Sequence, residues 1–298
     1  MFGLEYFGFR ALWSPVVLLI FIAIGIVYLL LTGPWSHRFK EAERVPVYKI
    51  ISFLSGLFLL YLAQAGPLSL LSHLMFSAHM LGMAVSYIIA PPLLLIGLPA
   101  WMVKPLLQRL RWLRPLRFMM HPLLTVVFFN ALFSFYHLPD VHDYVMVHYG
   151  IHLLFYIALF ITSVMMWWHV ICPVPEYTVL SGLKKMGYIF INGVLITPAC
   201  ALIIFSDHAM YAVFNDANTW ARAMGYCVPN GQNWVLDEFA GPQFFSLVSS
   251  REDQQLGGVI MKLLQEITYG LLLGYVFREW YKKENPEEED LNPIMDPS

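Results

Sequence analysis

Long apolar segments alternate with short polar ones along the whole chain. A helix needs roughly 20 apolar residues to cross the hydrocarbon core of a bilayer. Seven windows meet this requirement, at about 15–32, 50–66, 73–98, 122–138, 147–170, 187–206 and 255–277. The pattern predicts an all-α polytopic membrane protein, a bundle of seven transmembrane helices in one domain, 1–280. Pro91 and Pro92 should kink or break the third helix, because proline lacks a backbone N–H and clashes with the preceding turn.

Composition agrees with this prediction. Apolar residues make up 58% of the 298 residues and charged residues only 13%, against about 25% charged residues in soluble domains. The net charge is −2, and the sequence contains neither a glycine-rich phosphate loop nor a basic nucleic-acid patch. Cys172, Cys200 and Cys227 suggest no disulfide framework. We therefore expect the lipid bilayer, and no nucleic acid, as a partner.

Basic residues concentrate in alternate loops. One side of the predicted bundle carries Arg38, Lys40, Arg44, Lys49, Lys104, Arg109, Arg111, Arg114, Arg117, Lys184, Lys185, Arg278, Lys282 and Lys283. The other side carries only Arg10, Arg222 and Arg251. Because cytoplasmic loops hold the excess of Lys and Arg, the N-terminus is predicted outside and the C-terminus inside. The acidic tail 281–298 is expected to be disordered in the cytoplasm.

One outer loop, 207–254, is unusually long, which is typical of a functional or partly ordered loop. It contains several large aromatic residues, Tyr211, Phe214, Trp220, Tyr226 and Trp234. Aromatic residues of this kind are enriched at membrane interfaces, so parts of the loop are expected to lie there.

Seven of the ten histidines fall at the predicted outer side: His73, His79, His137, His142, His148, His152 and His208. A single histidine at a helix end is usually an interfacial polar group, and a methionine in a membrane helix usually packs. Ionisable groups in the hydrocarbon are costly, however, and mark sites. Imidazole suits copper, zinc, iron and nickel, and thioethers favour Cu(I). The collection therefore favours an outward-facing metal site.

Helical spacing suggests how the histidines divide. His148 and His152 are four residues apart and would share one helix face, so they could bind one ion together. His73 and His79 are six apart, which separates them by about 120° around a straight helix. They could not chelate one ion. His79 instead shares a stripe with Met75 and Met83.

The last helix carries a second polar feature. Asp253 is expected to cap its outer end, and the adjacent Gly257 and Gly258 would permit close helix approach. Lys262 and Glu266 lie inside the membrane four residues apart, and they could form an ion pair that lowers the cost of both charges. A structural and a functional role for this pair are both open.

Several segments together resemble one family. The segments "HLMFSAHMLGMAVSYIIAPPLLLIGLP", "HPLL", "FYHLPDVHDY", "HYGIHLLFYIALFITSVMMWW", "SDHAMYAVF" and "DQQLGGVIM" are similar, in order and membrane position, to the CtaG proteins. These are caa3-type cytochrome c oxidase assembly factors of Gram-positive bacteria. The resemblance runs from about 45 to 280, and departs from the family at Gly257 and Lys262.

The resemblance implies a non-enzymatic, multi-pass protein of the bacterial plasma membrane that assists oxidase assembly, with oxidase subunits as partners and copper as the cofactor delivered. The family's histidine and acidic motifs map onto His73, His79, His137, His148, His152, His208 and Asp253. On this basis we expect an outward cup that holds copper, with His148 and His152 as the main pair. His79 with Met75 or Met83 would be a third contribution.

Three other functions stay open. Histidines on facing helices can ligate haem, with His79 and His152 as the best pair, which would make the protein a membrane redox protein. A copper transporter or permease would need a continuous polar path, and the inner halves of the third and fifth helices offer little beyond Met165 and Met166. A purely structural role in oxidase assembly would leave the histidines to packing or to contact with the oxidase.

Overall fold

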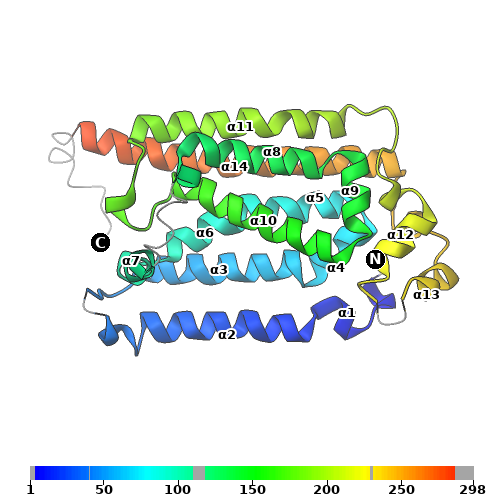
Figure 1. The fold of residues 1–298 in the computed structure, drawn as a ribbon, viewed down its shortest axis with the longest axis horizontal. Helices are drawn as coiled ribbons and strands as arrows, with labels where there is room; N and C mark the ends of the chain where they lie inside the picture. Colours follow the sequence, from blue (N-terminus) through cyan, green and yellow to red (C-terminus); the bar gives the residue numbers. More distant parts are fainter. Residues whose placement is uncertain (1–3, 40, 110–117, 229–230, 286–298) are drawn as a thin grey trace, which may run out of the picture.

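The computed structural model describes residues 4–39, 41–109, 118–228 and 231–285, and within them the chain is all-helical, without strands. The helices are α1 (Phe9–Trp13), α2 (Pro15–Thr32), α3 (Val47–Gln64), α4 (Pro67–Leu74), α5 (Phe76–Ala84), α6 (Ala90–Gly97), α7 (Ala100–Arg109), α8 (Pro122–Tyr136), α9 (Pro139–Met146), α10 (Tyr149–Trp168), α11 (Gly182–Ile204), α12 (Ala217–Met224), α13 (Gly231–Glu238) and α14 (Ser250–Glu284). Short 3₁₀ helices are η1 (Leu4–Tyr6), η2 (Ser36–Arg38), η5 (Pro175–Tyr177), η6 (Ala212–Phe214) and η7 (Pro242–Phe244), and a π-helical turn, η3 (Val85–Ile89), joins α5 to α6. The long helices run side by side as a bundle (Figure 1).

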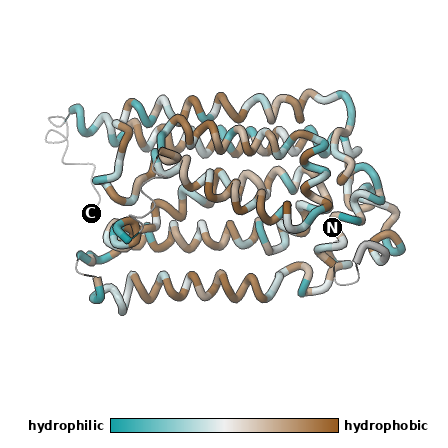
Figure 2. The backbone as a smooth tube through the Cα atoms, in the orientation of Figure 1, coloured by the Kyte–Doolittle hydropathy of each residue, from teal (hydrophilic) through white to brown (hydrophobic). Residues whose placement is uncertain are grey.

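Six helical segments among the described residues are long and apolar enough to cross a membrane: Phe9–Thr32, Val47–Leu74, Phe76–Gly97, Tyr149–Trp168, Gly182–Ile204 and Ser250–Glu284. A seventh span exists if α8 and α9, which meet at a 79° bend, count as one. Hydrophobic residues line the middle of the long helices, and hydrophilic residues gather toward both ends (Figure 2). The predicted membrane bundle is thus confirmed, with six spans or up to seven.

The α5–α6 segment is the centre of the bundle. In its apolar window 72% of the residues are buried inside the protein, whereas only 11% of the residues in the window of the α1–α2 segment are buried. The predicted kink or break near Pro91 takes the form of a π-helical turn just before that residue, after which the helix continues. Proline has no N–H, so Pro91 cannot donate to the carbonyl of Tyr87. That carbonyl accepts instead from Ser163 (2.5 Å) and from the Trp167 indole (3.2 Å).

The chain breaks where a continuous third helix was expected. Helix α4 ends at Leu74, Met75 is extended (φ −136°, ψ 139°), and α5 begins at Phe76. His73 and His79 therefore lie on two different helices, and the prediction that both open the third helix is wrong. The helical stripe of Met75, His79 and Met83 is likewise interrupted at Met75.

Helix α14 packs closely on two neighbours, as its glycines predict. A Cβ at Gly257 would lie 2.8 Å from Cδ1 of Phe76 on α5, and one at Gly258 would lie 2.7 Å from Cγ1 of Ile204 on α11. The prediction that Asp253 caps the N-terminus of α14 is wrong. Ser249 caps α14 in a capping box with Glu252, and this frees Asp253 for another partner.

The 207–254 segment is a folded layer over one end of the bundle. It contains η6, α12, α13 and η7. Tyr211, Phe214 and Trp220 are buried in the protein, so their predicted place at the membrane interface is wrong. Trp220 packs in a cluster with Phe7 and Phe245.

The two ends of the bundle differ in chemistry. We call the end that carries α4, α9 and α12 the histidine end, and the end that carries α7 the basic end (Figure 1). Helix α14 extends to Glu284, beyond the expected start of the tail. Lys40, Arg111, Arg114, Arg117 and the remainder of the predicted tail, 286–298, lie outside the described residues.

Candidate functional site

Three histidines from three helices meet inside the histidine end. His79 lies on α5, His137 ends α8, and His142 lies on α9. Pro139 begins α9 and Leu138 before it is extended, because proline cannot continue the preceding helix and disfavours helical backbone at the residue before it. The resulting bend turns α9 across the bundle and brings His142 over His79. We call these three residues the imidazole cluster.

The imidazole cluster is compact and buried. The ring centroids of His79 and His142 are 5.0 Å apart, and those of His79 and His137 are 6.0 Å apart. The exposed fractions are 1% for His79, 5% for His137 and 0% for His142. Two imidazoles that share an ion through nitrogen bonds of 2.0–2.1 Å have centroids roughly 5 to 6.5 Å apart. The spacing of both ring pairs lies in this range.

Most ring nitrogens of the cluster have no hydrogen-bond partner among the described residues. Both nitrogens of His79, both of His142 and Nε2 of His137 are buried and unpartnered. The exception is Nδ1 of His137, which donates to the Phe133 carbonyl at 2.7 Å. Nδ1 of His142 is 3.6 Å from the Asp143 carboxylate, too far for a hydrogen bond. Buried polar atoms are almost always paired, so five unpartnered nitrogens in one place point to a ligand.

Aromatic side chains enclose the cluster. The centroid of His142 lies 4.8 Å from that of Tyr211, 5.3 Å from Tyr136 and 5.8 Å from Phe214. Phe76 stacks on Tyr211 at 4.5 Å. These rings surround the imidazoles with aromatic carbon and offer few polar partners to their nitrogens.

The segment that covers the cluster is tied to it by two groups. The Asp143 carboxylate, next to His142 in sequence, accepts from the backbone N–H of Ala212 (2.8 Å) and of Val213 (3.1 Å). The Tyr211 hydroxyl donates to the His137 carbonyl at 2.7 Å. The cover is therefore fixed to both α9 and the end of α8.

No three His, Cys, Asp or Glu side chains in the described part of the chain form a ready-made metal site. The cluster is instead a set of close imidazole pairs around His79. Cu(I) is satisfied by two or three ligands, whereas structural Zn²⁺ is almost always four-coordinate. Paired imidazoles therefore match Cu(I) better than zinc.

A second histidine pair lies nearby. His152 packs against His73 with centroids 5.7 Å apart, and against Tyr156 at 4.1 Å. His148 precedes the first residue of α10 and donates through Nδ1 to the Tyr144 carbonyl (2.6 Å). Its ring contacts the Tyr144 ring, with centroids 4.2 Å apart. The i, i+4 rule holds inside a helix, and α10 begins one residue after His148. The structure thus places His152 beside His73, whereas His148 lies beside Tyr144.

The other predicted site residues lie apart from the cluster or are engaged elsewhere. His208 is exposed, and Met75 packs against the Trp220 cluster. Met83 is buried one turn below His79. The Asp253 carboxylate accepts from the backbone N–H of Phe76 and from the N–H and hydroxyl of Ser77, so it is occupied as a helix cap.

His142 is the residue that sequence reasoning left out of the site. The signal for His142 was present in "HLPDVH", where Pro139 begins a new helix and places His142 one turn into it.

The predicted ion pair in α14 is present. Lys262 Nζ lies 2.6 Å from Oε1 of Glu266, and it also donates to Thr197 (2.9 Å) and Gln265 (3.0 Å). Because Thr197 is on α11, the lysine links α14 to α11.

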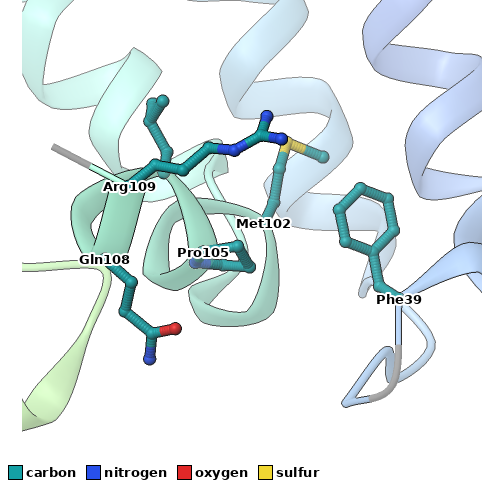
Figure 3. A pocket seen from close by; sticks show the side chains of 6 residues that line it. Phe39, Met102, Pro105, Gln108 and Arg109 are labelled. Carbon is teal, nitrogen blue, oxygen red and sulfur yellow. The ribbon is translucent and has the colours of Figure 1, made fainter.

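A pocket of about 510 Å³ lies at the basic end and is lined by Phe39, Met102, Pro105, Leu106, Gln108 and Arg109 (Figure 3). Its lining offers one guanidinium and one thioether but no imidazole or thiol. This pocket is therefore unrelated to the histidine chemistry.

A family model described as cytochrome c oxidase caa3 assembly factor (Caa3_CtaG) matches residues 26–283. The chain belongs to this family. Comparison with curated proteins and with solved structures finds no match.

Proposed function

We propose that this member of the caa3 oxidase assembly-factor family holds Cu(I) in the imidazole cluster and supplies it to cytochrome c oxidase. The observation that carries the proposal is the set of five buried ring nitrogens without partners on His79, His137 and His142. Imidazole is a copper ligand, and copper is the cargo here. We propose a non-catalytic role, because the family is described as an assembly factor.

The proposed orientation places the histidine end outside the plasma membrane and the basic end in the cytoplasm. Its support is the bias of Lys and Arg. Lys104, Arg109, Lys184 and Lys185 are in or beside the helices that reach the basic end (Figure 1). In this orientation the cluster faces the side from which an oxidase subunit would receive copper.

Two alternatives fit the contacts less well. For haem, the pair expected to face each other was His79 and His152, but the contacts between them run through the rings of Tyr136 and Tyr156. For transport, the buried polar side chains between α8, α11 and α14 bond to one another: Asn192 accepts from Asn130 (2.6 Å) and donates to Tyr269 (2.7 Å). Such internal bonding suits a structural role.

The test uses purified protein loaded anaerobically with buffered Cu(I), alongside oxidase activity in a deletion strain. His79→Phe with His142→Phe keeps ring volume but removes four nitrogens, and should lower Cu(I) affinity at least tenfold and reduce oxidase activity. His208→Phe, at an exposed position, is the matched control and should change neither. Full oxidase activity with the double variant would overturn the proposal. Absence of Cu(I) binding by the wild-type protein, with oxidase still dependent on it, would indicate a scaffolding role instead.

A further inference from the structure

A side cavity of about 600 Å³ opens beside the imidazole cluster, between α1, α4, α10 and α12. It is separate from the cluster, since none of His79, His137 and His142 lines it. The histidines and the cysteine in its wall are His73, His152 and Cys227, and Arg10 and Met146 also line it. The two histidines and the cysteine come from three elements that are far apart in the sequence, and the fold brings them to one wall.

Each of the three side chains offers one donor atom to a metal ion. His73 donates through Nδ1 to the Ser69 carbonyl at 2.9 Å, which leaves its other ring nitrogen, Nε2, to interact with the Cys227 side chain. A ring nitrogen fixed in this way to a carbonyl is the usual arrangement of a metal-binding histidine. Nε2 of His152 is buried and has no partner among the described residues.

The third donor in the cavity wall is the thiol of Cys227. The Cys227 thiol lies beside the His73 ring, is half-buried, and belongs to a free cysteine. Both other cysteines are outside this wall. Thiolate sulfur selects soft ions, Cu(I) above all among those that imidazole also binds.

The cavity adjoins the imidazole cluster through one methionine. Met146 lines the cavity, and its sulfur accepts a hydrogen bond from the Tyr136 hydroxyl at 3.6 Å. The Tyr136 ring in turn stacks on His79 with centroids 5.8 Å apart. A soft ion in the cavity would therefore lie one aromatic side chain away from the cluster.

We infer that the side cavity is a second Cu(I) site, with Cys227 sulfur and the Nε2 atoms of His73 and His152 as ligands. It rests on the proposed function only for the identity of the cargo. On binding, the thiol releases its proton to the solvent that reaches the half-buried sulfur, a Cu–S bond forms, and no electron is transferred. All three donors are needed to hold the ion, and they close on it by side-chain rotation.

The test is protection of Cys227 from alkylation by N-ethylmaleimide in the full-length protein, read by mass spectrometry of the cysteine peptides. Cu(I) is buffered with a competing chelator so that an isolated thiol stays unoccupied. We expect Cu(I) to slow alkylation of Cys227 at least tenfold and to leave Cys172, the internal control, unchanged. Equal alkylation of Cys227 with and without Cu(I) would overturn the inference.

Two variants sharpen the result. His152→Phe should abolish most of the protection, whereas the His79→Phe, His142→Phe variant should keep it. Copper–sulfur scattering in X-ray absorption should also be weaker in Cys227→Ser than in Cys200→Ser. If the His79→Phe, His142→Phe variant supports full oxidase activity while Cu(I) still protects Cys227 from alkylation, the function proposed for the imidazole cluster is wrong and the Cu(I) site in the side cavity is supported. Protection that survives in His152→Phe and His73→Gln alike would contradict the three-ligand site.

Discussion

The Asp253 carboxylate lies 2.7 Å from the backbone nitrogen of Phe76, 177 residues away in sequence. It caps the first turn of α5 from a different helix, and it also accepts from the N–H and hydroxyl of Ser77. The break before α5 leaves N–H groups that need such an acceptor. This contact sets where α5 begins, and therefore the height of His79 in the bundle.

Replacing Asp253 with Asn should destabilise the protein and misplace His79. Loss of a charged cap that accepts several donors should lower the free energy of unfolding by about 2 kcal/mol. Thermal unfolding followed by circular dichroism in detergent would measure it. Asp207→Asn is the control, because that carboxylate is 99% exposed at the same end. Equal unfolding of the two variants would contradict the capping role.

A methyl group at Gly257 should separate α14 from α5. The added Cβ would lie 2.8 Å from the Phe76 ring and 3.1 Å from Cα of Ser77, and the backbone cannot move aside without lengthening the bonds to Asp253. We expect Gly257→Ala to destabilise by about 2 kcal/mol, since overpacking in a close-packed interior costs about 1–3 kcal/mol. Gly274→Ala is the matched control, because nothing lies within 4 Å of its Cβ. Unchanged stability of Gly257→Ala would contradict this account.

The sequence predicts the helices far better than their breaks. Apolar windows mark the long spans to within a few residues, because burial in lipid demands continuous apolar helix. The break at Met75 carries no proline or glycine, and it depends on the Asp253 carboxylate from the other end of the chain. A contact between residues 177 positions apart cannot be predicted from the local sequence around Met75. For the same reason the sequence assigned Asp253 to its own helix, whose cap is supplied by Ser249.

The sequence predicts that the candidate site is rich in histidine, but not which histidines lie next to one another. The crowding of histidines on one side is a sequence property, and the structure places most of them at one end. Their partners depend on where helices begin: α10 begins after His148, and α9 begins at Pro139. These starts join His152 to His73 and His142 to His79. The i, i+4 rule applies only within one helix, so it cannot predict which histidines pair when a helix begins between them.

The Lys262–Glu266 pair should contribute through its link to α11. Removing Glu266 alone leaves the ammonium with Thr197 and Gln265, whereas removing Lys262 alone leaves the carboxylate with only one long hydrogen bond, from Gln265 at 3.4 Å. We expect Lys262→Met to be more destabilising than Glu266→Leu, and the double variant to be milder than the sum of the two. A double-mutant cycle on unfolding in detergent measures the coupling, expected at about 1 kcal/mol. Simple additivity would show that the two charges act independently.

If the imidazole cluster holds Cu(I) as proposed, Asp143 should control how fast the ion leaves it. Its carboxylate holds the covering segment through the N–H groups of Ala212 and Val213, yet it is not itself one of the clustered rings. In Asp143→Ala the segment would open more often, while the three imidazoles remain.

We therefore expect Asp143→Ala to bind the same amount of Cu(I) but to release it to a chelator about tenfold faster, which corresponds to roughly 1.4 kcal/mol of lost hydrogen bonding. Stopped-flow transfer to a coloured chelator measures the rate. Asp140→Ala is the control, because this carboxylate is on the same helix but exposed. A loss of binding capacity in Asp143→Ala, with an unchanged release rate, would assign the carboxylate to the site itself instead of to its cover.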